Sequence, residues 1–361
     1  MKNYKKPELT PEWLTATLKR NGFLPQGEMI TIRSELRPVI GITADFVFIE
    51  VTNSKDISVE LPRFFVLKQN KSEPIVSSEL EGWFRELIEA EVRFYQSLAR
   101  KIDSTALIQC YDAAFDNDSL EFHLLLADLS HTHYQTTWPF PPSGKECHLI
   151  VESLAKIHGA WWGKQKEIEE FTHKSAIENM EDGLLRAKEN IPSFISFLGD
   201  RISNDRAKIL ELTPQAERAF RKRLEAGKLT LVHGDSHFWN FFLPKDSKTD
   251  TIRIFDWQGY GAGFGPTNIA QFLGLHVYSE MRERIQKSLL QRYYEILLSV
   301  GITDYSWEEC WYDYRLSAIP QLWAPVGNWK QNIPVHIWWS KLESAFAIFE
   351  DLDCEEIIKT V

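Results

Sequence analysis

The chain has 361 residues, of which 43% are hydrophobic and 25% are charged, and its formal net charge at pH 7 is −10. This composition is typical of a globular protein with enough residues for two lobes, and it excludes a disordered chain. The negative charge argues against a nucleic-acid partner, whose phosphates it would repel.

The sequence contains no segment that predicts membrane insertion or secretion. The lysine-rich start, with Pro7 and Pro11, lacks the apolar core of a signal peptide, and no uncharged apolar run reaches the roughly 18 residues of a membrane span. The four cysteines form no CxxC pair, which fits a reducing compartment. We therefore expect a cytoplasmic protein without a membrane partner, and the sequence leaves its oligomeric state open.

The first 127 residues predict a small lobe built mainly of strands. Thr10 and Pro11 suit the N-cap and first position of a helix that ends near Asn21. Short β-branched and aromatic runs separated by turn residues then predict a mainly antiparallel sheet with one inserted helix. The expected strands span residues 30–32, 44–51, 63–68, 106–113 and 121–127, and the helix spans 78–98.

Helical patterns dominate after a proline-rich segment at 138–144 that suits neither helix nor central strand. The expected helices span residues 147–162, 175–187, 205–226, 268–275, 279–298, 307–316 and 335–349, with strands near 230–243 and 252–255. The prediction is a bilobal α+β fold, with a small antiparallel N-terminal lobe at 1–127 and a large, mainly helical C-terminal lobe at 128–361.

The strongest chemical signal is the segment 231–240, Leu-Val-His-Gly-Asp-Ser-His-Phe-Trp-Asn. An apolar pair leads into Asp235, Asn240 follows, and a second apolar pair leads into Asp256. A lone Gly-Asp is more typical of a capped turn, but this combination suits magnesium-assisted phosphoryl transfer. Asp235 is predicted to accept the proton of the acceptor hydroxyl or to orient it, while Asn240 and Asp256 bind Mg²⁺.

Such a site also needs a cation on the nucleotide phosphates, and Lys68 ends a predicted strand. Glu91, on the following helix, is its expected partner, with Glu86 or Glu89 as alternatives if the helix is rotated. A strand-end lysine on the surface is the competing interpretation. The backbone of Ala127, Asp128 and Leu129, at the lobe boundary, is predicted to contact the adenine edge, which makes 1–127 the nucleotide-binding lobe.

The loop that would cover the phosphates is poorly marked. Residues 39–46 contain one glycine, and the chain has neither a GxGxxG nor a P-loop motif. An ordinary hairpin turn explains this segment nearly as well, so its phosphate-binding residues stay unassigned.

Together these segments resemble the aminoglycoside phosphotransferase and choline kinase-like superfamily, with ecdysteroid-kinase-like phosphotransferases nearest. The resemblance is carried by Lys68, Glu91 and residues 124–129, 154–158, 233–240, 256–258 and 265–270. It implies a protein-kinase-like fold, ATP and Mg²⁺ as cofactors, and the site roles given above. Asp256 is followed by Trp-Gln where protein kinases have Phe-Gly, and no Ala-Pro-Glu segment follows. Both departures argue for a small-molecule substrate.

The expected activity is Mg-ATP-dependent phosphorylation of a hydroxyl on a small molecule, such as an amino alcohol, an aminoglycoside-like compound or a natural-product intermediate. Tryptophans interleaved with Glu308, Glu309 and Asp313 near the C-terminus would suit a cationic acceptor, and an uncharged hydroxylated metabolite is the chief rival. A pseudokinase-like nucleotide-binding module without turnover, and N-phosphorylation or nucleotidyl transfer on the same fold, are the alternatives. The sequence leaves open the acceptor and the choice between ATP and GTP.

Overall fold

The computed structural model describes residues 8–36, 44–53, 57–71, 81–102, 106–137, 139–248 and 250–360. The chain divides into a first unit, Met1–Tyr134 with Phe242–Gly259, and a second unit, Gln135–Phe241 with Tyr260–Val361. Our predicted lobe boundary, at residues 127 and 128, assigned the stretch 242–259 to the C-terminal lobe. The structure instead groups this stretch with the first unit, because its strands and its turn pack there.

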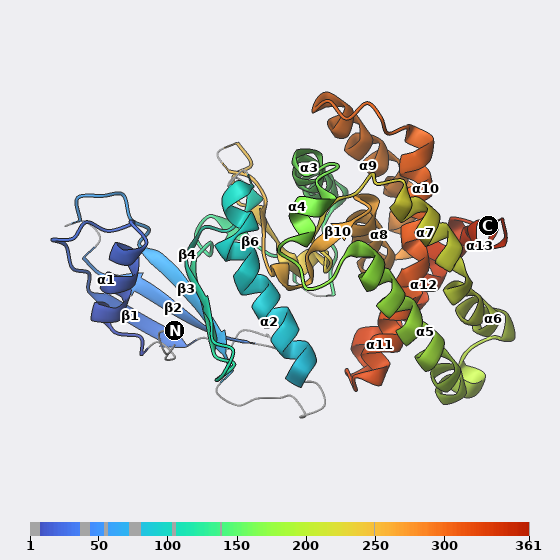
Figure 1. The fold of residues 1–361 in the computed structure, drawn as a ribbon, viewed down its shortest axis with the longest axis horizontal. Coiled ribbons are helices and arrows are strands. Elements are labelled where there is room, and N and C mark those ends of the chain that lie inside the picture. The colour runs from blue at the N-terminus through green and yellow to red at the C-terminus, as the bar shows by residue number, and fades with distance from the viewer. Residues whose placement is uncertain are drawn as a thin grey trace. The chain divides into compact units, whose positions relative to one another are not determined.

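The first unit contains a five-stranded antiparallel sheet in the order β1-β2-β3-β5-β4 (Figure 1). The strands are β1 Ile32–Leu36, β2 Ala44–Val51, β3 Phe64–Asn70, β4 Cys110–Phe115 and β5 Phe122–Ala127. Helix α1 (Pro11–Arg20) packs its buried Leu14 and Leu18 into a core with Phe65 and Leu125. Helix α2 (Glu81–Gln96) packs against β4 and β5.

These elements confirm the predicted antiparallel sheet with one inserted helix. Thr10 caps α1 by accepting a hydrogen bond from the amide of Trp13 at 3.1 Å, and Pro11 is the first helical residue, as expected. Two strands are shifted by up to four residues: β1 spans Ile32–Leu36 instead of 30–32, and β4 begins at Cys110 instead of residue 106 and carries an irregularity between Cys110 and Asp112. Alternating hydrophobicity does not reveal such an irregularity, because the offset comes from pairing with β5.

The later stretch of the first unit forms a second, three-stranded sheet in the order β6-β8-β9. Strand β6 (His133–Tyr134) pairs antiparallel with β8 (Phe241–Pro244), and β9 (Arg253–Ile254) completes the sheet. The 3₁₀ turn η7 (Trp257–Gly259) follows and packs against α2. This arrangement delivers Asp256 beside elements of the N-terminal sheet.

The second unit is mainly helical, and α8 packs against both α10 and α12. Its helices are α3 Gly144–Ala160, α4 Gln165–Glu169, α5 Ala176–Leu198, α6 Asn204–Leu212, α7 Glu217–Glu225, α8 Pro266–His276, α9 Ser279–Ser299, α10 Trp307–Ala318, α11 Trp323–Lys330, α12 Val335–Asp351 and α13 Cys354–Lys359. Strands β7 (Thr230–Val232) and β10 (Gly261–Gly263) pair antiparallel. The single helix predicted at 205–226 was wrong, because a 3₁₀ turn containing Pro214 separates α6 from α7.

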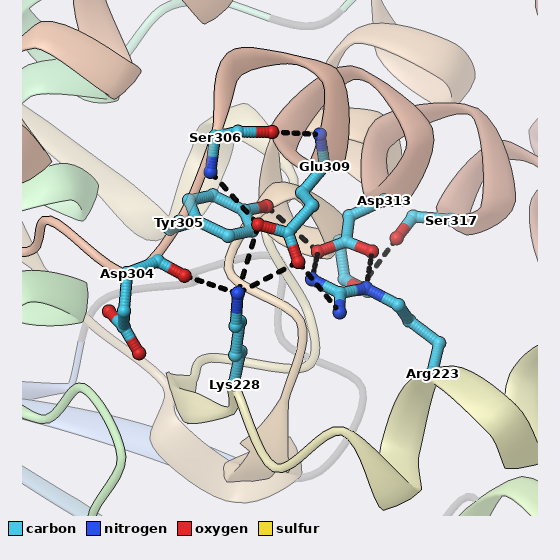
Figure 2. A network of polar contacts seen from close by, with 9 residues as sticks. Arg223, Lys228, Asp304, Tyr305, Ser306, Glu309, Asp313 and Ser317 are labelled. Carbon is cyan, nitrogen blue, oxygen red and sulfur yellow. Dashed lines mark hydrogen bonds and ion pairs between the residues drawn. The ribbon is translucent and has the colours of Figure 1, made fainter.

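A partly buried ionic network ties α10 to α7 and the segment after it (Figure 2). The guanidinium of Arg223 donates to both carboxylate oxygens of Asp313, at 2.5 and 2.9 Å, and the hydroxyl of Tyr305 donates to Asp313 at 2.8 Å. Lys228 donates to both oxygens of Glu309 at 2.8 and 2.9 Å. The bidentate pair of Arg223 with Asp313 fixes orientation as well as distance, so it restrains α10 relative to α7.

The four cysteines are free thiols, and three of them are buried. Among the helices in the described ranges, none is long and apolar enough to span a lipid bilayer.

Candidate active site

The predicted site residues fall in both units, and Lys68 anchors the set in the first unit. Its ammonium donates to Glu91 at 2.6 Å and to Asp256 at 2.8 Å, and it lies 4.8 Å from the ring centre of Phe255. The side chains of Lys68 and Glu91 are only 3% and 2% exposed, which rules out the competing interpretation of a surface lysine. The expected contact with Glu91 is therefore present. Asp256 as a second partner was not expected.

The charges of this cluster stabilise one another. Burial alone would lower the pKa of Lys68, but the carboxylates of Asp256 and Glu91 outweigh it and raise the pKa above its ordinary value. Burial raises the pKa of Glu91, and the ammonium of Lys68 only partly offsets this. Lys68 thus stays a cation at all physiological pH values. It is a fixed positive charge of the kind that a phosphate oxygen requires.

Helix α2 is held in place by two contacts on one face. Glu91 binds Lys68, and Phe94, three residues later on the same face, stacks on Trp257 with ring centres 4.3 Å apart and planes at 7°. Trp257 is 1% exposed. The tryptophan that follows Asp256, which the sequence marked only as a departure from protein kinases, therefore couples the Asp256 turn to the helix that carries Glu91.

Asp256 itself has a left-handed backbone conformation, with φ of 63°. Few non-glycine residues adopt this conformation, although aspartate tolerates it best, and it costs roughly 1 kcal/mol. The turn directs one carboxylate oxygen to Lys68, while the side chain remains 18% exposed. The ion pair with Lys68 therefore does not seal Asp256 from solvent.

In the second unit, strand β7 delivers the segment 233–240 to a tight loop. Gly234 adopts φ of 80°, which a side chain would strain. The amide of Asp235 donates to Nδ1 of His233 at 3.2 Å, and the amide of His237 donates to the carbonyl of Asp235 at 3.0 Å. The carboxylate of Asp235 is left 37% exposed. His233 therefore supports the loop.

Helix α8 holds this loop through neutral side chains. Asn268 accepts from the amide of His233 at 3.0 Å, and Gln271, one turn further along, accepts from the amide of Ser236 at 2.7 Å. Our sequence reasoning missed both residues. Their spacing of three on one helix, directly after the Gly-Pro start of α8, is the signal that could have found them.

A second layer fixes Asn268 in turn. The side-chain oxygen of Asn268 lies 3.1 Å from Nε2 of His158, and Nδ1 of that ring lies 3.0 Å from the hydroxyl of Tyr293. Burial lowers the pKa of His158 to about 4, so the ring is neutral at pH 7. Gly265 is required beside it, because any side chain there would overlap the hydroxyl of Tyr293.

Asn240 is buried, and its amide nitrogen donates to the carbonyl of Asp235 at 2.8 Å. Because the nitrogen is engaged, the side-chain oxygen is the atom left for a cation. A neutral oxygen from Asn240 and a charged one from Asp256 are ligands that Mg²⁺ accepts, together with phosphate oxygens and water. These residues therefore fit the predicted metal.

The segment predicted to contact adenine is partly occupied by the sheet. The amide of Ala127 donates to the backbone carbonyl of Gln109 at 2.9 Å, and the amide of Asp128 donates to the backbone carbonyl of Phe64 at 3.2 Å. The carbonyl of Leu129 accepts from two amides, at 3.0 and 2.8 Å. A nucleotide contact here would use the remaining backbone groups of this segment. Residues 39–43 of the unassigned phosphate loop at 39–46 lie outside the described residues.

Two of the three acidic residues of the predicted acceptor wall are engaged within the protein, whereas Glu308 is exposed. Asp313 and Glu309 are bound by Arg223 and Lys228 in the network of Figure 2, so their charges are neutralised internally. An aromatic groove of about 460 Å³ does lie between α5 and α12, but its polar lining includes Arg201. Asp313 and Glu309 are therefore not available to a cationic acceptor, and the charge of the acceptor stays a prediction.

The model of the ecdysteroid kinase-like family matches residues 69–301, which is more than half of the chain. The chain belongs to this family. The predicted family is confirmed, and it places the chain among the small-molecule kinase-like phosphotransferases. None of the curated proteins compared with the sequence matches it.

Solved structures of kinases share the fold. An ethanolamine kinase from Plasmodium vivax has a TM-score of 0.54 at 12% identity, with 91% of this chain and 83% of that one covered. A choline kinase from Cryptosporidium parvum has a TM-score of 0.55 at 14% identity, covering 96% and 95%. A GDP complex of an aminoglycoside 2′-phosphotransferase has a TM-score of 0.52 at 12% identity, covering 96% and 98%. The predicted bilobal, kinase-like α+β fold is confirmed.

Proposed function

We propose that the protein is a Mg-ATP-dependent phosphotransferase that phosphorylates a hydroxyl group of a small molecule. The observation that carries this proposal is the buried ammonium of Lys68, held between Glu91 and Asp256. A buried cation held by a helix carboxylate, next to a second carboxylate whose side chain is 18% exposed, suits the binding of nucleotide phosphates and their metal.

Each site residue has a proposed role. Lys68 binds the phosphates that stay on the nucleotide, with Glu91 as its partner, and the segment 127–129 contacts the base. Asn240 and Asp256 bind Mg²⁺, which supplies charge neutralisation on the phosphates when it is present. Asp235 orients the acceptor hydroxyl and takes up its proton.

The neighbours support a small acceptor. Their names describe kinases of ethanolamine, choline and an aminoglycoside, so the fold serves several small hydroxylated compounds. One of them is a GDP complex, which makes the choice between ATP and GTP part of the test.

The metal assignment is tested by the change in melting temperature on addition of ATP or GTP, with and without Mg²⁺. We expect stabilisation of the wild type that needs Mg²⁺ and is lost in Asp256→Ala. The matched control is Asp118→Ala, which removes an exposed carboxylate of the same unit and should respond like the wild type. Equal stabilisation without metal would contradict the assignment.

Turnover is tested by ATP consumption against amino alcohols, aminoglycosides, macrolides, hydroxy acids and sterols. A phosphorylated hydroxyl in the product, identified by ³¹P NMR, supports the proposal. A phosphorylated nitrogen or a transferred nucleotidyl group would replace it with one of the alternative reactions. Nucleotide binding without turnover of any acceptor would make the protein a pseudokinase-like binding module.

A further inference from the structure

Helix α8 is joined to α10 by a side-chain contact that lies next to Asn268. The hydroxyls of Thr267 and Ser317 are 2.9 Å apart, and Thr267 directly precedes Asn268 in the first turn of α8. Ser317 is 1% exposed, and Thr267 is half-buried. Both residues belong to the second unit, as does the loop at residues 233–240 that carries Asp235, here called the Asp235 loop. The contact is therefore made within one compact part of the chain.

Asn268 makes its contacts with the Asp235 loop and its support through a single atom. The side-chain oxygen of Asn268 accepts from the amide of His233 at 3.0 Å and lies 3.1 Å from Nε2 of His158. The side-chain nitrogen of Asn268 is buried without a hydrogen-bond partner among the described residues. Such a side chain can pivot about its oxygen, so the position of that oxygen depends on how firmly the neighbouring backbone is held.

Helix α10 offers a firm support on the face that carries Ser317. Asp313 lies one turn before Ser317 on the same face, and it accepts two hydrogen bonds from Arg223 and one from Tyr305 (Figure 2). The side chain of Asp313 is 1% exposed and that of Arg223 is 10% exposed. A bidentate pair at such a position restrains the rotation of α10. Ser317 thus meets Thr267 from a helix that is itself held in place.

The rate of a positioned reaction depends steeply on this kind of support. A displacement of about 1 Å, caused by a change far from the reacting atoms, can lower a rate by ~10²-fold. Asp235 is the residue that we propose to orient the acceptor hydroxyl, and its loop is held from α8 by Asn268 and Gln271. A shift of the first turn of α8 would therefore move the carboxylate of Asp235.

We propose that Thr267 and Ser317 are positioning residues of the Asp235 loop. Their hydroxyl contact fixes the first turn of α8, and this turn places the oxygen of Asn268 against the amide of His233. The effect on the rate rests on the function proposed above. The effect on the loop itself can be measured without turnover.

A contact that serves packing alone would behave differently. Its loss would lower the free energy of unfolding and leave kcat unchanged. Loss of a positioning contact lowers kcat, whereas the affinity for ADP without metal stays constant, because the residues that we propose to bind the nucleotide itself lie in the first unit. The two roles are therefore separable by experiment.

The test compares Thr267→Val, which keeps the shape of the side chain without its hydroxyl, with Thr267→Ser, which keeps the hydroxyl. Ser317→Ala and the double variant Thr267→Val, Ser317→Ala complete a double-mutant cycle. The control is Ser288→Ala, which removes an exposed hydroxyl that binds the carbonyl of Ile285 within its own helix, α9.

Four quantities are measured for each protein. They are kcat and KM with the best acceptor of the screen, the dissociation constant of ADP without metal, the free energy of unfolding in urea, and the rate of amide hydrogen exchange. Exchange is followed by mass spectrometry in a peptide that covers residues 231–240. A peptide from α6 is the internal reference, because it shows any change that affects the whole unit.

We expect Thr267→Val and Ser317→Ala each to lower kcat by ~10-fold and to speed exchange in 231–240 by ~5-fold, with the dissociation constant of ADP changed by less than about twofold. Thr267→Ser should restore most of kcat. The double variant should be no slower than the slower single variant, because both changes remove the same contact. Ser288→Ala should match the wild type.

An unchanged kcat in both single variants overturns the proposal, and so do losses of kcat that multiply in the double variant. Reduced stability with unchanged kcat and exchange also overturns it, because the contact then serves packing alone. Each of these results in an active wild-type enzyme leaves the proposed function standing. A wild type that turns over no acceptor overturns the proposed function, and the exchange of 231–240 then decides whether the contact positions the loop.

Discussion

The Lys68 cluster of the first unit and the Asp235 loop of the second are built on opposite principles. In the cluster, a buried cation is fixed by two carboxylates, and the charges neutralise one another. In the loop, the side-chain amide groups of Asn268, Gln271 and Asn240 hold the backbone by hydrogen bonds. The side chain of Asp235 stays 37% exposed.

The difference fits the roles that we propose for the two regions. A phosphate-binding cation must remain charged and in place, and ion pairs achieve both. A carboxylate that exchanges a proton with a substrate must not be neutralised by a permanent partner, so neutral hydrogen bonds hold its loop instead. We therefore expect substitutions in the cluster to change stability and substitution of Asp235 to change chemistry.

The largest expected effect is on turnover in Asp235→Asn. The amide keeps the shape of the side chain but cannot take up a proton, so kcat should fall by ~10²-fold or more, with nucleotide affinity nearly intact. Steady-state kinetics and nucleotide titration measure the two quantities. Asp200→Asn, at an exposed position of the same unit, is the control. Unfolding of Asp235→Asn would break the comparison, because the loop would then depend on the charge.

Removal of the cation in Lys68→Met should reduce the free energy of unfolding by about 3–5 kcal/mol, since two carboxylates are left together without it. Urea denaturation measures the loss. The double variant Lys68→Met, Glu91→Leu should recover part of it, because the fully buried carboxylate is gone as well. A single variant as stable as the wild type would show that the ion pairs do not hold the cluster.

The neutral scaffold of the loop is tested at Gly265. In Gly265→Ala the added methyl group overlaps the hydroxyl of Tyr293, and we expect a loss of about 3 kcal/mol, at the upper end for overpacking. Tyr293→Phe removes that hydroxyl, so the double variant should be less destabilised than the sum of the single ones. Strict additivity in urea denaturation would contradict the clash.

The smallest effect concerns the pH dependence of stability through His158. Its pKa is about 4 in the folded protein and about 6.5 when unfolded, so the unfolded chain binds the extra proton on acidification. The contribution of neutral His158 to the free energy of unfolding is complete above pH 6.5 and is lost as the pH falls toward 4. The loss between pH 8 and pH 5 is about 2 kcal/mol. His158→Gln should lose correspondingly less stability over this interval in urea denaturation. An identical pH dependence of the two proteins would show that His158 is not held neutral.

The helices, the strands and the family were predictable because short patterns in the sequence indicate them. Thr10 with Pro11 starts α1, alternating runs mark the sheet, and the order of Asp235, Asn240 and Asp256 is a pattern that few other sites share. The break at Pro214 was missed because the helical periodicity continues across it, and the prediction followed the periodicity.

By itself, the sequence determined the fold class and the family, and it identified the charged residues of the candidate site. These depend on the spacing of residues along the chain. Only the tertiary structure decided how those charges are used. Asp256 is a second partner of Lys68, and Asp313 and Glu309 are bound by Arg223 and Lys228. The reason is physical: pairing and desolvation depend on which side chains meet, and residues far apart in the sequence meet only in the folded protein.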